Sequence, residues 1–314
     1  MVTLTSRPYA GAADLRPLID LLLTCRAAES IDPWPPLYEL RHYLQPGGPQ
    51  LAADTRLWED RAGQLRACAT IWDGEILVFG IHPQAQSDDL AAQVFSWGVA
   101  RARELGHLRG ERPALFVPLR ADDASGCALL ERQGFTPEEW SILRMRRPLD
   151  APLADAQAPD GFVLRPVAGE RELAAALAMH QEVFVKAAVT ARDRLALIRA
   201  ADDITTLDIV AVAPDGAFAA FCLCSAGRAA GRPGRGEGWI DLLGTRPAFR
   251  GRGLGRAILL SGLQQLKACG ADVALLGTTS WNVAAQWLFA SVGFQIMHQV
   301  RWYAWQEDAW GEVA

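Results

Sequence analysis

The sequence lacks most of the features that mark metal-binding, membrane-spanning or nucleic-acid-binding proteins. Its six cysteines are scattered, with no Cys-x-x-Cys pair and no Cys/His cluster, so we expect buried free thiols in a reducing compartment and no bound metal. A formal net charge of −5 argues against a chain whose main partner is nucleic acid. The N-terminal stretch has no basic segment followed by a long apolar run, so we expect no signal peptide, no membrane anchor and a cytoplasmic protein.

Glycine and arginine are instead concentrated in one stretch, residues 248–260, which reads AFRGRGLGRAILL. From Leu254 onward the apolar residues follow helical spacing, so the glycines and arginines come just before a helix. A helix N-terminus presents unpaired N–H groups and roughly half a positive charge, and glycine lets the backbone approach an anion closely. The stretch therefore predicts a diphosphate site. An ordinary turn with solvated arginines is the alternative.

Two common diphosphate motifs are excluded by what this stretch lacks. A dinucleotide-binding fingerprint needs a third glycine where the chain has Arg256, and an acidic residue at the end of the next strand, which here reads LLGTTS. A Walker A loop needs Gly-Lys-Ser/Thr, which is absent. The sequence thus argues against NAD and nucleoside triphosphates.

Three short patterns recur in the two halves of the chain, at offsets of 158, 159 and 164 residues. They are Arg-Pro at 7–8 and 165–166, Gly-Phe at 134–135 and 293–294, and a proline before a strand-to-helix turn at 83 and 247. Such a repeat predicts two copies of one fold. We expect domains at 1–148 and 161–314, joined by an Ala/Pro/Asp-rich linker at 149–160.

Each half has the element order of an α/β protein with a mixed sheet. In the second half we expect helices at about 171–186 and 190–200, and a hairpin turning at 214–216. A strand with a bulge or close approach at Gly244 then leads into the helix that begins at Leu254. A strand, a helix and another strand around the glycine-rich turn imply a local parallel pair.

The spacing Arg-x-x-Gly-x-Gly, here Arg250 to Gly255, resembles the motif of the GNAT superfamily of N-acetyltransferases. Support comes from the downstream pattern N-x-x-A-x-x-L-F-x-x-x-G-F, which begins at Asn282. These motifs cover residues 238–294, and the tandem layout, shared with double-domain members such as mycothiol synthase, covers nearly the whole chain. The resemblance implies two tandem GNAT acyl-CoA N-acyltransferase domains, of which typically one is active.

The resemblance also implies acetyl-CoA as co-substrate, with its diphosphate on the backbone amides of 251–256 and its pantetheine arm between splayed strands. The implied cofactor-binding residues are Leu243, Gly244, Thr245, Arg250, Gly251, Arg252, Gly253, Leu254, Gly255, Arg256, Asn282 and Phe289. In the first half the aligned turn carries Asp88 and Asp89. Because carboxylates repel a diphosphate, we expect the first domain not to bind coenzyme A and to serve as scaffold or acceptor wall.

The catalytic groups depart from the family pattern. Many GNAT enzymes have Glu where this chain has Trp239, so Asp241, on the same strand face, is the candidate base, acting through a water. The family often has a Tyr acid where this chain has Phe289, so the candidate acids are Tyr303 and water. His180 and Glu182 are candidate acceptor contacts, although a solvated surface position suits either.

We therefore expect an N-acetyltransferase that moves an acyl group to a primary amine by direct attack in a ternary complex, with its active site in the C-terminal domain. The acceptor is a small molecule or a peptide amine, with no nucleic acid, membrane or metal involved, and the protein is a monomer or homodimer. An acyl group larger than acetyl stays open. The alternative is a non-catalytic acyl-CoA-binding or sensing protein, suggested by the losses at Trp239 and Phe289.

Overall fold

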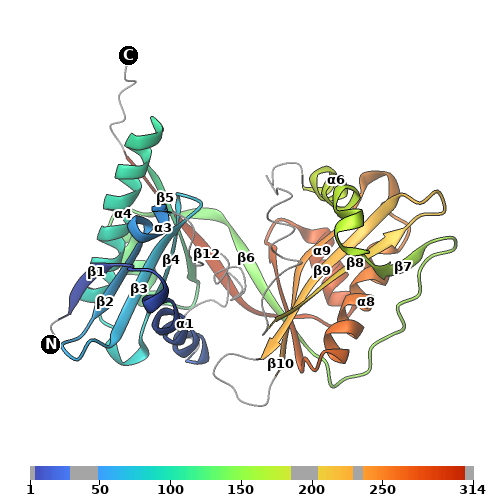
Figure 1. The fold of residues 1–314 in the computed structure, drawn as a ribbon, viewed down its shortest axis with the longest axis horizontal. Helices are drawn as coiled ribbons and strands as arrows, with labels where there is room; N and C mark the ends of the chain where they lie inside the picture. The colour runs from blue at the N-terminus through green and yellow to red at the C-terminus, as the bar shows by residue number, and fades with distance from the viewer. Residues whose placement is uncertain (1–3, 29–48, 185–203, 229–235, 308–314) are drawn as a thin grey trace. The chain divides into compact units, whose positions relative to one another are not determined.

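The computed structural model describes residues 4–28, 49–184, 204–228 and 236–307 (Figure 1). The chain forms two compact units. Unit 1 contains residues 1–143 and 298–314, and unit 2 contains residues 144–297. The helix expected at 190–200 lies outside the described residues.

Unit 1 is built on a mixed sheet with the strand order β1-β2-β3-β4-β5-β12, followed by the first part of β6. The pairs β1–β2, β2–β3, β3–β4 and β5–β12 are antiparallel, whereas β4 and β5 are parallel. The strands are β1 (Thr5–Pro8), β2 (Thr55–Glu59), β3 (Leu65–Trp72), β4 (Ile76–Ile81), β5 (Ala114–Arg120), β6 (Thr136–Pro148) and β12 (Gln295–Gln306).

The helices of unit 1 cover both faces of its sheet because side chains alternate along each strand. In β3, Ala69 and Ile71 pack in the cluster that includes Phe95 of α4, whereas Cys68 packs in the cluster that includes Leu22 of α1. The helices are α1 (Ala12–Ala27), α3 (Pro49–Asp54), the short η1 (Pro83–Ala85), α4 (Asp88–Arg109) and α5 (Ala124–Arg132).

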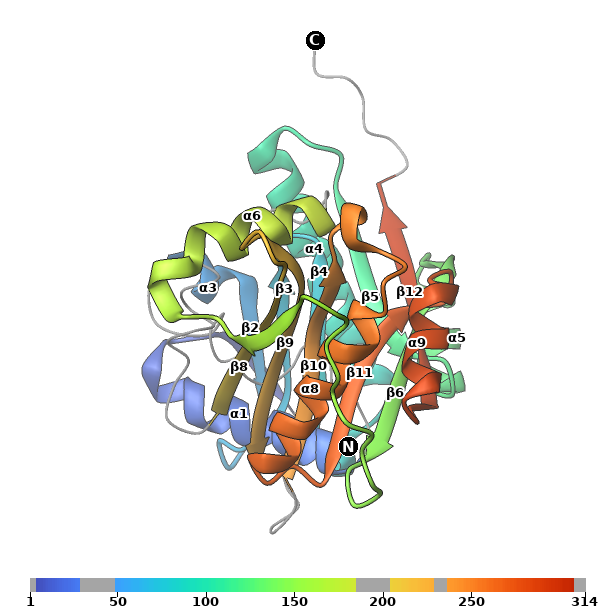
Figure 2. The same ribbon diagram turned by 90° about the vertical axis from the view of Figure 1, so that its right-hand side faces the viewer.

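Unit 2 repeats this plan with the strand order β7-β8-β9-β10-β11, followed by the last part of β6. Its β10 and β11 are parallel, and they precede and follow α8 in the chain (Figure 2). This confirms the parallel pair expected around the glycine-rich turn. The strands are β7 (Val163–Pro166), β8 (Ile204–Val212), β9 (Phe218–Arg228), β10 (Gly236–Thr245) and β11 (Val273–Thr279).

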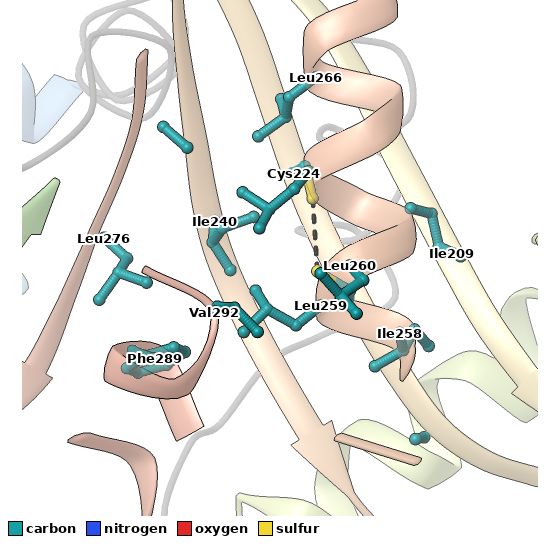
Figure 3. Packing of buried hydrophobic residues seen from close by; sticks show 14 of the residues in the cluster. Ile209, Cys224, Ile240, Ile258, Leu259, Leu260, Leu266, Leu276, Phe289 and Val292 are labelled. Carbon is teal, nitrogen blue, oxygen red and sulfur yellow. Dashed lines mark hydrogen bonds between the residues drawn. The ribbon is translucent and has the colours of Figure 1, made fainter. Parts of the chain in front are cut away.

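The core of unit 2 lies between the sheet and α8, which runs against β8, β9 and β10. Figure 3 shows Ile258 and Leu259 of α8 with Ile240 of β10 and Phe289 of α9 in one cluster. Phe221 of β9 packs in a separate cluster with residues of α6. The helices are η2 (Gly169–Glu172), α6 (Leu173–Val183), η3 (Pro247–Phe249), α8 (Leu254–Ala268) and α9 (Val283–Ser291).

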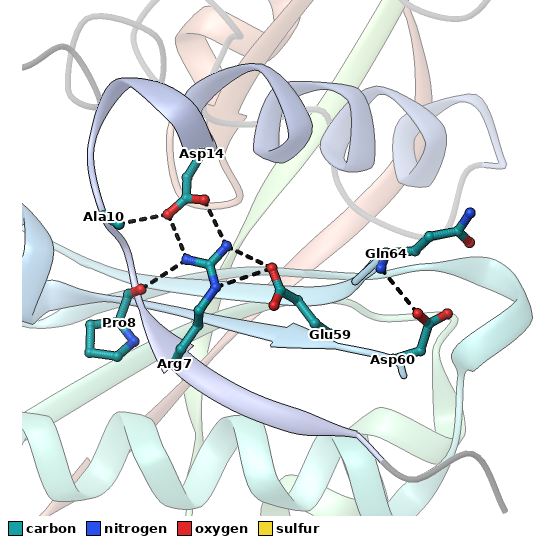
Figure 4. Close-up of polar contacts among 7 residues, drawn as sticks. All are labelled: Arg7, Pro8, Ala10, Asp14, Glu59, Asp60 and Gln64. Carbon is teal, nitrogen blue, oxygen red and sulfur yellow. Dashed lines mark hydrogen bonds and ion pairs between the residues drawn. The ribbon is translucent and has the colours of Figure 1, made fainter. Parts of the chain in front are cut away.

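A matching polar motif after the first strand of each unit supports the repeat. Arg7 donates two hydrogen bonds of 2.7 Å to Asp14, and Arg165 donates two of 2.8 and 2.7 Å to Glu172 (Figure 4 shows the first). In both motifs the acid stands seven residues after the arginine. Its carboxylate also accepts a hydrogen bond from the backbone N–H three residues after the arginine, that of Ala10 in unit 1 and Ala168 in unit 2. The tandem arrangement expected from the sequence is thus visible in side-chain contacts.

The compact units are divided differently from the sequence repeats. Strand β12 lies in the second repeat, yet its residues 300–306 pair with β5 in unit 1. The end of β6 lies correspondingly in unit 2. Residues 149–160 also belong to unit 2, where the N–H of Leu149 donates to the carbonyl of Asp272 at 2.8 Å. The boundaries at 148 and 161 therefore stay a prediction about the repeat.

Candidate active site

The start of α8 has an open, left-handed backbone turn. Gly251 and Gly253 have φ angles of +75° and +82°, a region that favours glycine. A Cβ on Gly251 would meet nothing within 4 Å. Gly253 caps the helix without any side-chain hydrogen bond, and the first turn contains no acidic residue. The hydrogen bonds of the helix begin where the N–H of Ala257 donates to the carbonyl of Gly253. The backbone N–H groups that precede Ala257 are the unpaired donors of a helix N-terminus, so they suit an anion.

Three arginines surround this turn, and each is anchored by a neighbouring group. Arg250 donates to the carbonyl of Thr245 at 3.2 Å. The guanidinium of Arg252 lies 5.5 Å from the ring centre of Phe249. Nη1 of Arg256 donates to the carbonyl and the hydroxyl of Ser291, both at 3.3 Å. The side chains of all three arginines are exposed, so positive charge borders the uncapped helix start.

The matching helix start in unit 1 is already occupied by the chain's own groups. The hydroxyl of Ser87 accepts the N–H of Leu90 at 3.2 Å, which caps α4. Asp88 and Asp89 stand in the first turn, and Asp88 forms an ion pair with Arg132 at 3.2 Å. The helix charge here is balanced by carboxylates, and the absence of diphosphate binding in the first half stays a prediction.

Strands β10 and β11 of unit 2 pair over a short distance only. Their register ends where Trp239 faces Leu275, although β10 continues to Thr245 and β11 to Thr279. The hydroxyl of Thr279 is buried and has no hydrogen-bond partner within the described residues. Beyond Trp239 the backbone groups of the two strands are therefore not paired with each other.

A β-bulge places Asp241 just past the end of that pairing. The register of β10 on β9 shifts between Ile240 and Leu242, so Asp241 is the extra residue. Both of its carboxylate oxygens are buried. The sequence suggested a bulge or a close approach at Gly244, and the structure shows the close approach, because a Cβ there would lie 2.5 Å from Val183.

Helix α6 contacts the start of the glycine-arginine turn. Glu182 accepts a hydrogen bond from the Nε–H of Arg246 at 2.7 Å. Arg246 is the residue that joins β10 to η3. His180 is 1% exposed, with its ring centre 5.2 Å from Phe184 and 5.5 Å from Phe221. The expected surface position of His180 is therefore wrong: an aromatic cluster that the sequence pattern did not reveal encloses the ring.

Asn282 and Phe289 lie at opposite ends of α9. The side chain of Asn282 accepts the N–H of Ala285 at 3.2 Å and so caps the helix, leaving its amide nitrogen as a donor. Phe289 is buried in the core of unit 2, 6.0 Å from Phe294. The structure therefore gives Phe289 a packing position beneath the site rather than one that faces a ligand.

Tyr303 lies in unit 1, where β12 pairs with β5 opposite Val117. The side chain is fully buried, and its hydroxyl has no hydrogen-bond partner in the part of the chain that the structure describes. Burial, and next the neighbouring Cys127, raise the pKa of Tyr303 to about 12. Unit 2 brings the glycine-arginine turn and the end of β10 together, whereas Tyr303 belongs to the other unit's core.

Three contacts of the site had no clear signal in the sequence. Ser291 holds Arg256, and Pro159 lies 3.9 Å from the position of a Cβ on Gly253. The methyl group of Leu288 approaches a Cβ position on Gly255 to 3.4 Å. All three come from segments distant in the chain from the turn, which local spacing does not place.

The described residues contain neither a metal-binding cluster nor a membrane-spanning helix. Among them, no group of three or more His, Cys, Asp or Glu side chains is arranged to hold a metal ion. No helix in the described ranges has the length and apolar character needed to cross a bilayer. All six cysteines lie in the described ranges; none forms a disulfide bond, and all are buried apart from Cys269, which is exposed.

The chain resembles known acetyltransferases over most of its length. A family model described as Acetyltransferase (GNAT) family matches residues 173–294. The mycothiol acetyltransferase of Nocardioides sp. is 31% identical over 90% of this chain and 94% of its own. That of Frankia alni is 27% identical over 98% and 96%.

Two solved structures share the fold. A GCN5-related N-acetyltransferase from Sphaerobacter thermophilus aligns with a TM-score of 0.72 at 20% identity, covering 96% of this chain and 95% of that one. A tandem GNAT protein from the clavulanic acid biosynthesis pathway aligns with a TM-score of 0.71 at 16% identity, covering 98% and 100%.

Proposed function

Because the chain belongs to the GNAT family of acetyltransferases, as an N-acetyltransferase with two such domains in tandem, we propose that its acetyl donor binds in unit 2 and that its acceptor is a small-molecule primary amine. The GNAT family uses acetyl-CoA. The contrast between the two helix starts carries the proposal: α8 is uncapped, glycine-rich and flanked by arginines, whereas α4 is capped and acidic.

The residues of unit 2 fit a donor with a diphosphate and an amide-containing arm. The open glycines and exposed arginines suit the diphosphate, and the stretch of β10 that is not paired with β11 suits the amides of the arm. The residues proposed to hold the diphosphate are Arg250, Gly251, Arg252, Gly253, Leu254, Gly255 and Arg256. Those proposed for the arm are Leu243, Gly244, Thr245 and Asn282.

When bound, the donor supplies an acetyl thioester. The backbone N–H groups of β10 near Leu243 are proposed to hold the acyl oxygen as negative charge develops on it. Asp241, at the bulge, takes the proton from the attacking amine through a water. A thiol with a pKa of about 8.5 needs no dedicated acid, so water returns the proton to sulfur. The transfer is direct, within a ternary complex and with no covalent enzyme intermediate.

The acceptor is proposed to belong to the class that the relatives' name indicates. Two relatives that match nearly the whole chain are mycothiol acetyltransferases, and mycothiol is a small molecule. A peptide amine is the competing acceptor. Either one reaches the same carboxylate and backbone groups on β10.

The experiment is a thiol-release assay with full-length protein, acetyl-CoA and a panel of amines that includes amino sugars, aminoglycosides and short peptides. We expect release with a small polar amine and none without an acceptor. Calorimetry with coenzyme A runs in parallel. If the protein binds coenzyme A but releases no thiol with any amine of the panel, the catalytic proposal is contradicted and a sensor is favoured. If the protein does not bind coenzyme A, the proposed donor site is contradicted.

A further inference from the structure

Helix α9 has one buried face and one solvent-facing face. Phe289 and Val292 point into the core of unit 2, and Leu288 packs toward Gly255 at the start of α8. On the other face, Val283 is 55% exposed and Trp287 is 74% exposed. A single exposed aromatic side chain needs no explanation by itself. Its surroundings decide whether it has a function.

The exposed face of α9 leads to the proposed diphosphate site. Ser291 follows Trp287 by four residues and so stands one turn further along the same face. It accepts both hydrogen bonds of Arg256 Nη1. Arg256 is the third residue of α8, and its Nε–H and Nη2–H donors are additional to those bonds. An indole and a fixed guanidinium therefore border one surface beside the uncapped helix start.

We infer that Trp287 stacks on the adenine base of the acetyl donor, while Arg256 faces a phosphate of the same adenosine. The inference rests on the proposed function, because it takes the diphosphate to lie at 251–256. Positive charge on Arg252 and Arg256, with no acid in the first turn of α8, favours an anionic aromatic ligand over an apolar protein surface. Stacking of a base on an aromatic side chain is typically worth about 5- to 150-fold in affinity.

The test compares two acetyl donors, acetyl-CoA and S-acetyl-4′-phosphopantetheine, which lacks the adenosine together with its 3′- and 5′-phosphates. With Trp287→Ala we expect the KM for acetyl-CoA to rise about tenfold, with kcat and the KM for the shorter donor unchanged. Trp287→Phe retains a stacking surface and should restore most of the affinity. Trp281→Ala removes another exposed tryptophan, 69% exposed, and should not separate the two donors.

Calorimetry and indole fluorescence with coenzyme A give readouts apart from activity. We expect coenzyme A to quench the wild-type fluorescence and the quenching to fall in Trp287→Ala. Equal effects on both donors, or unchanged coenzyme A affinity in a variant with wild-type melting temperature, would overturn the stacking and leave the proposed function standing. If Trp287→Ala changed only the oligomeric state of the protein, Trp287 would belong to a protein interface instead. Wild-type protein that binds neither donor would overturn both proposals.

Discussion

Arg165 holds Glu172 through two hydrogen bonds of 2.8 and 2.7 Å that tie the end of β7 to η2. The same carboxylate accepts the N–H of Ala168 at 2.7 Å. The Arg165 bonds first, and the Ala168 bond second, lower the pKa of Glu172 from 4.5 to about 2. The strand-to-helix corner is thereby fixed by an ionised carboxylate.

This pairing predicts a pH-dependent stability of unit 2. Because the folded-state pKa is depressed, the stabilisation is present above pH of about 4.5 and is lost as the pH falls toward about 2. Glu172→Gln should lower the free energy of unfolding at neutral pH by up to about 1 kcal/mol, since the pair is partly solvated. Urea unfolding of the variant and the wild type from pH 7 to pH 2.5 checks this.

The matched control is Glu139→Gln, which removes an exposed carboxylate that has no ion pair in the described chain. Its stability difference from the wild type should stay constant over the same pH range. A gap between Glu172→Gln and the wild type that is as large at pH 2.5 as at pH 7 would contradict the assignment.

The glycine-arginine turn could be predicted because its chemistry is local. The sequence placed the helix start at Leu254 and its end before Gly270, and the helix runs from Leu254 to Ala268 with Gly270 at φ +87°. The need for glycine at 251 follows from a positive φ that other residues rarely adopt. These features depend on a few neighbouring residues.

The places of Tyr303 and His180 could not be predicted because they depend on contacts between distant segments. Tyr303 is in the second sequence repeat, yet β12 continues into unit 1 and pairs with β5 there. His180 is enclosed by Phe221, which is 41 positions further along the chain. The bulge at Asp241 likewise appears only in the register of β10 on β9.

Tyr303→Phe tests whether the buried hydroxyl has any catalytic role. Because the hydroxyl is buried without a partner in the described residues, its removal should leave stability unchanged or raise it by about 1 kcal/mol. Thiol release should stay at the wild-type rate. A large fall in kcat with unchanged melting temperature would instead restore Tyr303 as an acid.

The packing role of the same side chain predicts the opposite behaviour for Tyr303→Ala. Removing a fully buried aromatic ring typically costs about 3–5 kcal/mol. Chemical denaturation of the two variants side by side separates the ring from the hydroxyl. Equal stability of the two variants would contradict the burial.

Asp241→Asn tests the proposed base. The amide cannot take a proton, so we expect kcat to fall by about a hundredfold or more, with the affinity for coenzyme A unchanged. The pH–rate profile should lose its acidic limb. Asp215→Asn, in the exposed turn between β8 and β9, is the control and should keep both the rate and the profile. A wild-type rate in Asp241→Asn would show that water takes the proton unaided.

Gly253→Asp tests the anion site by placing a carboxylate at the N-cap of α8, one position before its first turn, whereas α4 has its two acids within the first turn. The substitution adds a carboxylate next to the proposed diphosphate and forces a side chain into a φ of +82°. The charge should weaken coenzyme A binding by about a hundredfold or more in calorimetry. Gly253→Ala has the same backbone strain without the charge, and Pro159 at 3.9 Å leaves room for its methyl group. If both variants lose the same affinity, backbone geometry rather than charge limits binding, and the acidic turn of α4 alone does not explain why the first half would not bind the donor.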